Sequence, residues 1–456
     1  MSYSAALDGL HARAGELHAA PGQPRRKFRL EEMRTLVEAL GRPERRFRSV
    51  LIAGTNGKGS TSATLASILR CAGYHCGLYT SPHLVRVNER IQIDGSPISD
   101  DDFARHYFRV DDCARRLVDD GQLPGHPSFF EMLTALAFEA FAEAAVDIVV
   151  LEVGMGGRLD ATNVVEPMLS VITDISLDHM EWLGNTITEI AREKAGILRP
   201  GGVMVTLPQH PQANQAIGEV AVNLDVRGVN AAEFVPVPGT DSGHRSLEMR
   251  NRYELTVMGK HIEVDSPLAG AHQQRNIALA IATAIELRNQ NGYNITPKQI
   301  EEGIRDTRWP GRLERFSAPG LADVLVDVAH NPAGVWALRS ALSSLEDAGG
   351  RAQERTLIFG CMKDKAIDEM AQILFPLFNR VIAVPVASPR SATAEDLLQA
   401  AAKTGVPAVA TADGTEALEG AWAETPTDGL VVIAGSVYLI GEVRPLLTSL
   451  ARESKA

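Results

Sequence analysis

Short β-branched segments alternate with longer amphipathic segments along most of this chain, and this alternation restricts the fold more than any other feature. Four strand-like segments occur in the first half, namely "SVLIAG", "CGLYTS", "VDIVVLEVG" and "LSVITDIS". Amphipathic stretches separate most of them, as crossover helices do between strands that run in the same direction. The sequence therefore predicts an α/β fold on a doubly wound, mainly parallel sheet.

A second series of strand-like segments follows and indicates a second domain. Before it, "RYELTVMGKHIEVDS" has two alternating halves around a short turn and predicts an antiparallel hairpin, and "GAHQQRNIALAIATAIEL" predicts a helix. Proline and glycine then interrupt the pattern in "RDTRWPGRLERF", after which come "DVLVDVAH", "TLIFG", "RVIAVPV" and "LVVIAGS". A chain of 456 residues seldom has one core, so we expect domains at 1–306 and 307–456.

The net charge and the cysteines exclude several classes of protein. The formal charge is −12, whereas proteins that bind the nucleic-acid backbone rely on clustered Lys and Arg. Cys71, Cys76, Cys113 and Cys361 are too scattered for a disulfide framework or a cysteine zinc site, which favours a reducing compartment. No apolar run approaches the roughly 18 residues of a membrane span. We expect a cytoplasmic protein without nucleic-acid or membrane partners, whose cysteines are packing residues.

The segment "GTNGKGS" lies between the apolar run "VLIA" and the helix-like "TSATLASILR". It departs from the common phosphate-loop pattern G-x-x-x-x-G-K-[ST], because Ile52 occupies the first glycine position and Gly59 the hydroxyl position. Even so, glycines admit a phosphate close to the backbone, a helix N-terminus offers free N–H groups, and Lys58 adds a positive charge. A plain strand-to-helix turn with a solvated Lys58 is the alternative.

Polar residues follow or interrupt three of the predicted strands. Ser81 and His83 follow the second strand, Glu152 lies inside the apolar run "VVLEVG", and His179 follows "LSVITDIS". The carboxyl ends of parallel strands share one edge of a sheet, so these groups are expected beside the glycine-rich loop, as a set suited to magnesium. Burying Glu152 is costly unless a cation accompanies it, although an arginine salt bridge is an alternative. His179 alone suits a structural role, and Lys194 alone suits a solvated charge.

Nine segments together carry a resemblance to a known family. In chain order they are "GTNGKGS", "TSPHL", "FFEMLTALAF", "LEVGMGGRLDATN", "DHMEWLG", "EKAGI", "HQQRN", "WPGRLE" and "DVAHNP". From about residue 25 to residue 445 the chain resembles the Mur-ligase-type amide synthetases, specifically the dihydrofolate synthase/folylpolyglutamate synthase group. That family has the shorter loop, with one glycine between the lysine and the hydroxyl residue.

The resemblance implies a P-loop-type first domain with a small antiparallel subsheet, which holds ATP and the folate pocket. A smaller Rossmann-like second domain would close over ATP and bind glutamate. The implied catalytic residues are Lys58, Glu152, His179, Lys194 and His330, and the implied magnesium ligands are Ser81, Glu152 and His179. The implied ATP contacts are Gly54, Thr55, Asn56, Gly57, Lys58, Gly59, Ser60, Thr61, Asn276, Arg312 and Asp327. Lys194 matches a lysine that becomes carbamylated, a change from a cation to a carboxylate-like group.

The resemblance also implies where the other substrates bind. Ser128, Phe130, Asp160 and Ala161 match residues that line the pterin and pteroate pocket, and Ser436 lies in a segment near the glutamate site. Two of these residues have ordinary alternatives, because an aromatic residue such as Phe130 is usually part of the core. Ser436 follows a predicted strand, where a serine often caps a helix.

The implied activity is the ATP-dependent joining of L-glutamate to a pteroate or folyl carboxylate through an acyl phosphate. The segment "LDATN" resembles enzymes that accept 7,8-dihydropteroate, so we favour a bifunctional dihydrofolate synthase and folylpolyglutamate synthase, with 7,8-dihydropteroate or reduced folate as acceptor. A monofunctional folylpolyglutamate synthase is an alternative. Another Mur-type ligase is disfavoured, because the ATP domain begins near residue 50 and leaves no room for a further N-terminal domain. A nucleotide-controlled binding protein would need no acceptor pocket. We expect a monomer.

Overall fold

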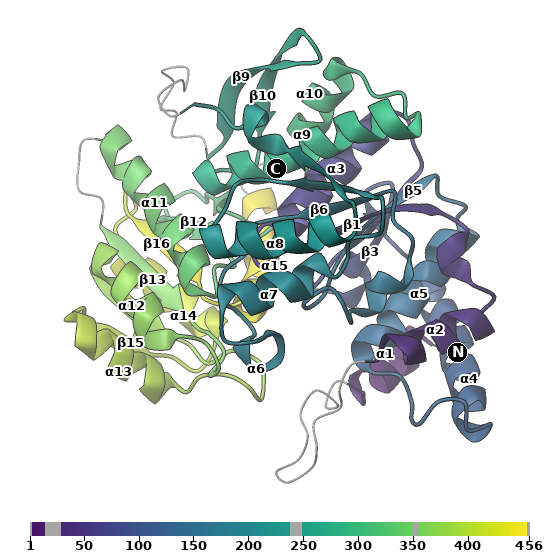
Figure 1. Cartoon of the computed structure of the whole chain (residues 1–456). Coiled ribbons are helices and arrows are strands. Elements are labelled where there is room, and N and C mark those ends of the chain that lie inside the picture. Colours follow the sequence, from purple (N-terminus) through teal and green to yellow (C-terminus); the bar gives the residue numbers. More distant parts are fainter. Residues whose placement is uncertain (1, 14–28, 238–248, 350–353, 454–456) are drawn as a thin grey trace.

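The computed structural model describes residues 2–13, 29–237, 249–349 and 354–453 (Figure 1). Two large sheets organise it. The first has eight strands in the order β4-β3-β2-β5-β1-β6-β7-β8, and the second has six in the order β11-β12-β16-β13-β14-β15. Most neighbouring strands run parallel, so the predicted α/β class with a mainly parallel first sheet is confirmed.

The first sheet is centred on β1, which spans Arg48–Ala53. The strands parallel to it in this sheet are β2 (Cys76–Tyr79), β5 (Ile148–Glu152), β6 (Leu169–Ile172), β7 (Val203–Thr206) and β8 (Arg227–Asn230). Two short antiparallel strands, β3 (Ile91–Ile93) and β4 (Ser96–Pro97), complete one edge. The central strands are apolar throughout, because helices cover both faces of a sheet of this kind.

Helices on the two faces bury alternate residues of β1. Leu51 and Ala53 pack on one side, and Val50 and Ile52 on the other. The first side holds α1 (Tyr3–His11), α2 (Leu30–Ala39), α4 (Asp100–Asp119) and α5 (Phe129–Glu143). The second side holds α3 (Lys58–Cys71), α9 (Ala271–Asn291) and α10 (Pro297–Arg305). Beside β6 and β7 lie α6 (Met180–Leu183), α7 (Ile187–Ala195) and α8 (Pro211–Asn223).

The predicted hairpin is present as a separate two-stranded sheet. It pairs β9 (Asn251–Val257) with β10 (Lys260–Ser266) in antiparallel register, and its turn places Met258 and Gly259 at positive φ. Two successive residues with positive φ suit the twist of a tight hairpin, and the glycine adopts this conformation without a steric penalty. The hairpin packs on α10 and on the core of the first sheet.

The second sheet lies beside the first, with its helices around it (Figure 1). Its strands are β11 (Glu314–Phe316), β12 (Asp323–Val326), β13 (Arg355–Phe359), β14 (Arg380–Ala383), β15 (Ala408–Ala410) and β16 (Leu430–Ala434), of which only β11 is antiparallel to its neighbour. Its helices are α11 (Pro332–Gly349), α12 (Ile367–Leu374), α13 (Ala394–Thr404), α14 (Gly414–Glu424) and α15 (Val437–Glu453). The predicted boundary at residue 306 falls between α10 and β11, and the division into two domains stays a prediction.

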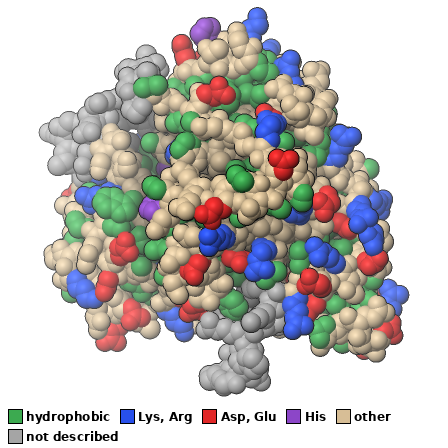
Figure 2. Space-filling model, viewed as in Figure 1, with side chains coloured by type: hydrophobic (Ala, Val, Ile, Leu, Met, Phe, Trp, Pro, Cys, Tyr) green, Lys and Arg blue, Asp and Glu red, His purple; other side chains and the backbone are tan. Residues whose placement is uncertain are grey.

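Two surface properties bear on the expected partners. On the face shown in Figure 2, Lys and Arg side chains are interspersed with Asp and Glu side chains over the described residues. Among those residues, no helix combines the length and the apolar character that crossing a bilayer requires. All four cysteines are free thiols, and of Cys71, Cys76 and Cys361, which were expected to be packing residues, Cys76 and Cys361 are buried and Cys71 is partly buried.

Candidate active site

The loop "GTNGKGS" connects β1 to α3 with a backbone that requires glycine at two positions. Gly54 has a φ of +155° and Gly57 a φ of +88°. A Cβ atom at Gly54 would lie 1.8 Å from Thr173 Oγ1, and one at Gly57 would lie 2.1 Å from Asn276 Oδ1. Both the conformation and the close approach therefore exclude larger residues, and the loop is held in one shape.

Some backbone amides of the loop are hydrogen-bonded within the protein, and others have no intrahelical partner. Thr55 and Asn56 donate their amides to the carbonyl of Asp174, at 2.9 and 3.1 Å, so those two amides are committed. Lys58 is the first residue of α3, and N–H groups in the first turn of a helix lack intrahelical partners. The amides that remain for an anion thus lie at the start of α3, around Lys58, Gly59 and Ser60.

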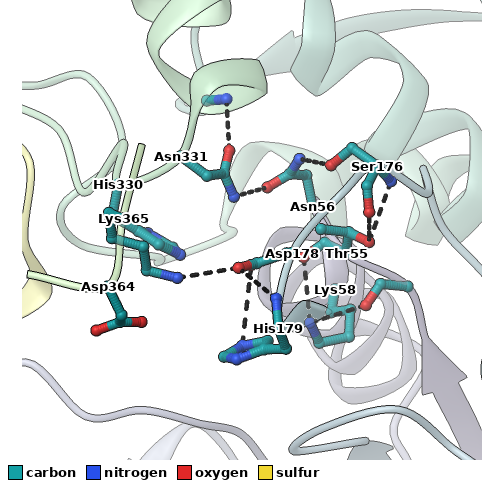
Figure 3. Close-up of polar contacts among 12 residues, drawn as sticks. Thr55, Asn56, Lys58, Ser176, Asp178, His179, His330, Asn331, Asp364 and Lys365 are labelled. Carbon is teal, nitrogen blue, oxygen red and sulfur yellow. Dashed lines mark hydrogen bonds and ion pairs between the residues drawn. The ribbon is translucent and has the colours of Figure 1, made fainter. Parts of the chain in front are cut away.

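Two lysine ammonium groups meet at one backbone carbonyl. Lys58 Nζ donates to Gly54 O at 3.1 Å and to Thr55 O at 3.2 Å (Figure 3). Lys194 Nζ donates to the same oxygen, Gly54 O, at 2.7 Å. Lys194 is 4% exposed, and burial together with Lys58 lowers its pKa to about 7. Among the described residues neither lysine forms an ion pair. This part of the site is therefore short of negative charge.

Glu152 is a buried carboxylate that forms no ion pair with any described residue. It ends β5, is 4% exposed, and accepts a hydrogen bond from the amide of Ser81 at 3.2 Å. Burial raises the pKa of Glu152 to about 7, although Lys58, the Ser81 amide, Arg312 and Arg90 each lower it. No ion pair to Glu152 occurs in the part of the chain that the structure describes, so the alternative of an arginine salt bridge is not found there.

His179 lies at the end of the segment after β6, in a left-handed conformation with φ +49°. Its Nε2 is 3.8 Å from Asp178 Oδ2. Desolvation by the surrounding chain, together with Lys365, Lys58 and Lys194, lowers the pKa of His179, and only Asp178 opposes this effect. Lys58 of the loop and Lys194 of α7 thus both lower the pKa of His179. Lys58, His179 and Lys194, which come from three separate segments of the chain, therefore lie close enough to influence one another.

The second sheet contributes two contacts that the sequence did not predict. Asn331, at the start of α11, donates from Nδ2 to Asn56 Oδ1 in the loop at 3.1 Å (Figure 3). Lys365 Nζ is 2.9 Å from Asp178 Oδ1, and each of these two side chains is 12% exposed. Burial alone would raise the pKa of Asp178, yet His179 and Lys365 hold it below its ordinary value. Both sheets therefore build the site.

Three predicted residues of the second series also face this region. His330 Nδ1 lies 2.8 Å from Val328 O, and burial lowers the pKa of His330. Asp327 accepts the amides of Leu313 and Ala329, at 3.0 and 2.8 Å, so it fixes the ends of two strands. Burial lowers the pKa of Arg312, while Asp327 and Glu152 raise it. Arg312 therefore shares an electrostatic environment with Glu152.

Asn276 and Trp309 lie against the glycines of the loop. Asn276 Oδ1 fills the space beside Gly57, and its Nδ2 donates to Gln273 Oε1 at 2.8 Å. A Cβ at Gly59 would lie 2.4 Å from the ring of Trp309, and the buried Nε1 of that ring has no hydrogen-bond partner among the described residues. Trp309 belongs to the quoted segment "WPGRLE" but was not singled out, because a lone aromatic residue does not reveal what it packs against.

The polar residues expected to line the folate pocket, unlike the charged residues near the loop, are hydrogen-bonded to neighbouring residues. Ser128 and Glu131 form a reciprocal capping box at the start of α5. Asp160 accepts the amide of Met155 at 2.9 Å and both the amide and the hydroxyl of Thr162, at 3.0 and 2.5 Å. The polar groups here are thus satisfied within the protein.

The apolar residues expected in this pocket form a packed wall. Phe130 packs against Gly154, where a Cβ would lie 2.4 Å from its ring, and its centroid is 6.0 Å from that of Tyr79. Ala161 is buried at 6% exposure. Ser436 lies elsewhere, and its Oγ accepts the amide of Tyr438 at 3.1 Å, which is the geometry of the alternative role as a helix cap.

The residues present fit a magnesium ion held together with a nucleotide better than a metal held by protein alone. Among the described residues, no three His, Cys, Asp or Glu side chains form a group able to hold a metal. Magnesium, however, commonly uses one or two carboxylates plus substrate phosphates and water. A buried Glu152 without a cation suits that arrangement, and the lowered pKa of Lys194 suits carbamylation, which requires a neutral amine.

Comparisons with known proteins agree with this geometry. Residues 126–284 match the Mur ligase middle domain, and residues 311–437 match the Mur ligase glutamate ligase domain. The chain is 36% identical to the folylpolyglutamate synthase of Lacticaseibacillus casei, over 91% of this chain and 93% of that protein. It is 35% identical to the dihydrofolate synthase/folylpolyglutamate synthase of Bacillus subtilis, over 92% of this chain and 94% of that protein.

A solved structure shares the whole fold. The folylpolyglutamate synthase of Mycobacterium tuberculosis, complexed with ADP and AMPPCP, superposes with a TM-score of 0.82. Its sequence is 31% identical, and the match covers 98% of this chain and 99% of that one. Both sheets and their relative arrangement are therefore those of a protein that binds adenine nucleotides.

Proposed function

Because the chain belongs to the Mur ligase family, in its dihydrofolate synthase/folylpolyglutamate synthase group, we propose that it joins L-glutamate to the carboxylate of a pteroate or folate. It is an ATP-dependent ligase. The observation that carries the proposal is a group of charged side chains without ion-pair partners among the described residues at the carboxyl edge of the first sheet: the buried Glu152 and Lys194, and the half-buried Lys58. Such charges are costly unless a charged ligand completes them.

The reaction proceeds through an activated carboxylate. An oxygen of the acceptor carboxylate attacks the γ-phosphorus of ATP, the bond to the bridging oxygen breaks, and an acyl phosphate and ADP result. The amine of L-glutamate then attacks the acyl carbon, loses a proton, and expels inorganic phosphate to leave an amide. Lys58 and Arg312 offset the charge on the transferred phosphoryl group, and electrostatic stabilisation of this kind dominates phosphoryl transfer.

A magnesium ion and a carbamylated Lys194 would both add charge to the site of phosphoryl transfer. Ser81, Glu152 and His179 would hold magnesium, which neutralises phosphate charge when it is bound. Carbamylation of Lys194 would replace one of the two cations at the Gly54 carbonyl by a negative group. The lowered pKa of Lys194 supports this proposal, because the neutral amine that reacts with carbon dioxide is populated near neutral pH.

The remaining site residues bind the nucleotide, the incoming glutamate or the acceptor. The loop residues Gly54 to Thr61 hold the phosphates, and Asn276, Arg312 and Asp327 complete the nucleotide site. His330 reaches the phosphates and the incoming glutamate from the second domain, at residues 307–456, and Ser436 contributes to the glutamate site. Ser128, Phe130, Asp160 and Ala161 line the acceptor pocket in the first domain, at residues 1–306. The enzyme acts as a cytoplasmic monomer.

A parallel assay tests this function. The purified protein receives ATP, magnesium and L-glutamate with either 7,8-dihydropteroate or a reduced folate monoglutamate, and the products are identified by mass. A bifunctional enzyme adds one glutamyl residue to the first acceptor and at least one to the second. Addition only to the reduced folate would show a monofunctional folylpolyglutamate synthase. ATP turnover that neither acceptor affects, over a broad range of magnesium concentration, would overturn the proposal.

Asp160→Ala tests whether the nucleotide cycle is coupled to an acceptor, as in a ligase, or is independent of one, as in a nucleotide-controlled binding protein. The side chain of Asp160 holds the loop after β5 rather than the nucleotide loop. On the ligase proposal, this variant loses coupling to the acceptor but keeps ATP binding. On the alternative, its nucleotide cycle is unchanged.

A further inference from the structure

Arg275 forms an ion pair beside the glycine-rich loop that none of the proposed roles uses. It lies near the start of α9, and its Nε and Nη2 are 2.9 and 2.6 Å from the two carboxylate oxygens of Asp174. Its Nη2 also donates to Pro208 O at 2.9 Å. Asp174 follows β6 and Pro208 follows β7, so one guanidinium joins α9 to the ends of two neighbouring strands.

Asp174 belongs to a short segment, residues 174–176, to which the loop is hydrogen-bonded. The Asp174 carbonyl accepts the amides of Thr55 and Asn56. Ser176 donates its amide to Thr55 Oγ1 at 3.1 Å, and its own Oγ accepts a hydrogen bond from Asn56 Nδ2 at 3.1 Å (Figure 3). The ladder between β1 and β6 ends before this segment. The position of the loop therefore depends on how this irregular segment is held.

Arg275 fixes Asp174 in one orientation. A guanidinium that contacts both oxygens of a carboxylate fixes its plane as well as its distance. The next amide along the chain, that of Ile175, donates to Gln209 Oε1 at 2.8 Å, so the segment is held at two adjacent residues. The side chains of Arg275 and Asp174 are 31% and 37% exposed, and an ion pair in that environment adds little to overall stability. Its effect on local geometry is therefore the more important one.

The same turn of α9 also contacts the loop directly. Asn276, the next residue, places its Oδ1 where a side chain at Gly57 would lie. Arg275 thus acts through Asp174 on the two residues before Gly57, while Asn276 acts on Gly57 itself. The amides left for an anion, at residues 58–60, follow immediately along the chain.

We propose that Arg275 is a positioning residue for the nucleotide phosphates, which acts through Asp174 and not by contact with the nucleotide. Its ion pair holds the Asp174 carbonyl where it receives the two amides of the loop, and this sets the direction of the free amides at the start of α3. The inference rests on the proposed function and adds to it a group that prepares the phosphate site in the free protein. Such preparation raises affinity, because less ordering of the loop remains to be done on binding.

Amide hydrogen exchange of the nucleotide-free protein tests the contact itself. Mass spectrometry of the peptide that contains Thr55 and Asn56 is compared in Asp174→Ala, in Arg275→Met and in the double variant. Asp174→Ala keeps the backbone carbonyl and loses only the carboxylate. We expect each single variant to speed exchange about three- to tenfold, the range of a partly exposed, charged hydrogen bond. The double variant should add nothing further, because both changes remove the same pair.

Calorimetric titration with AMPPCP and magnesium tests the consequence for the nucleotide. Arg275→Met should bind AMPPCP about three- to tenfold more weakly than the wild type. The matched control is Arg250→Met, because Arg250 has a similar exposure and its Nε pairs with Asp265 of the hairpin at 2.6 Å. We expect this control to leave both the exchange at the loop and the affinity unchanged.

The possible results distinguish the role of Arg275 from the proposed function. Faster exchange with unchanged affinity in Arg275→Met, or weaker affinity with unchanged exchange, would overturn the positioning role. Additive effects of the two substitutions on exchange would overturn it as well, because Arg275 would then not act through Asp174. A wild type that does not bind AMPPCP would overturn the proposed function, while the exchange rates would still decide whether Arg275 holds the loop.

Discussion

The nucleotide side and the acceptor side of this site handle buried polar groups in opposite ways. Around the loop after β1, Lys58 and Lys194 share one carbonyl, and within the described part of the chain Glu152 accepts a hydrogen bond only from the amide of Ser81. In the acceptor pocket, Ser128 is part of a capping box and Asp160 accepts hydrogen bonds from two residues. The nucleotide side therefore contains charged side chains without ion-pair partners, whereas the polar groups of the acceptor side are hydrogen-bonded to neighbouring residues.

This difference indicates which kind of ligand the nucleotide side and the acceptor side each recognise. Buried charge without a partner destabilises the free protein, and a ligand that completes it regains that free energy on binding. A satisfied polar frame around aromatic residues instead fixes the shape of a pocket. We therefore expect substitutions on the nucleotide side to change turnover strongly and to stabilise the free protein, whereas substitutions on the acceptor side should change substrate affinity.

The largest effect is expected for Lys58→Met. This change removes the mobile cation from the loop, and we expect turnover to fall about ten-thousandfold, in line with the loss of a cation that contacts a transferred phosphoryl group. Steady-state release of ADP in the presence of acceptor and glutamate measures it. The exposed Lys298, which pairs with Glu302 on α10, gives the control variant Lys298→Met, with unchanged turnover. A loss below tenfold in Lys58→Met would contradict its role.

Lys194→Met should stabilise the free protein at neutral pH in buffer without carbon dioxide. Burial lowers the pKa of Lys194 from 10.5 to about 7, so the unfolded chain binds more protons between these values. The lysine therefore costs stability in full below pH 7, and the cost disappears as the pH rises toward 10.5. We expect a gain of about 3 to 5 kcal/mol at pH 7 that vanishes near pH 10. Denaturant titrations at several pH values measure it, and a pH-independent gain would contradict the account.

Glu152→Gln should show the opposite dependence on pH. Burial raises the pKa of Glu152 from 4.5 to about 7, so the folded protein holds the extra proton between these values. The carboxylate costs stability in full above pH 7 and nothing below 4.5. We expect the variant to gain about 3 kcal/mol above pH 7 and to match the wild type at pH 4.5. The same gain at both pH values would show that Glu152 is not a buried charge.

Asp160→Asn probes the satisfied side. One amide oxygen cannot replace both carboxylate oxygens toward Met155 and Thr162, so we expect a loss of about 1 to 2 kcal/mol in stability and a higher KM for the acceptor. The affinity for ATP should not change. Asp413 caps α14 through two hydrogen bonds to a single oxygen, Oδ1, which an asparagine retains, so Asp413→Asn should leave stability and the affinity for both substrates nearly unchanged. An equal KM effect in both variants would contradict a local role for Asp160.

The smallest effect is expected where the second sheet touches the loop. Asn331→Ala removes the hydrogen bond to Asn56, which is worth about 1 kcal/mol, and also the bond that Asn331 Oδ1 accepts from the amide of Gly334 at the start of α11. We expect nucleotide affinity to weaken by about fivefold, with the KM for the acceptor unchanged. Calorimetric titration with AMPPCP measures it. A hundredfold loss would mean that the loop depends on the second sheet far more than a single hydrogen bond implies.

Much of the fold was predictable because local patterns determine it. The alternating segments identified β1, β2, β5, β6, the hairpin and four strands of the second sheet. The strands β7 and β8 were not identified, and β8 is short and largely exposed, with the pattern "RGVN", which lacks a clear alternation. The edge strands β4, β11 and β15, and β3 next to the edge, have only two or three residues each, too few for a periodic signal.

The candidate site was predictable where a single residue is chemically unusual in its segment. A carboxylate inside an apolar run singled out Glu152, and the glycine-rich loop singled out Lys58. Contacts that depend on how the sheets sit together were missed, because Lys365 and Asp178 are 187 residues apart and Asn331 and Asn56 are 275 apart.

The most direct test of the central claim is the dependence of nucleotide binding on magnesium in the wild type and in Glu152→Gln. AMPPCP is titrated into each protein with magnesium and again with a chelator present. If the buried charges of the loop region exist to hold a magnesium nucleotide, the wild type should bind far more tightly with magnesium, and Glu152→Gln should lose most of that difference. Equal binding by the wild type with and without the metal, or an unchanged difference in Glu152→Gln, would contradict the claim.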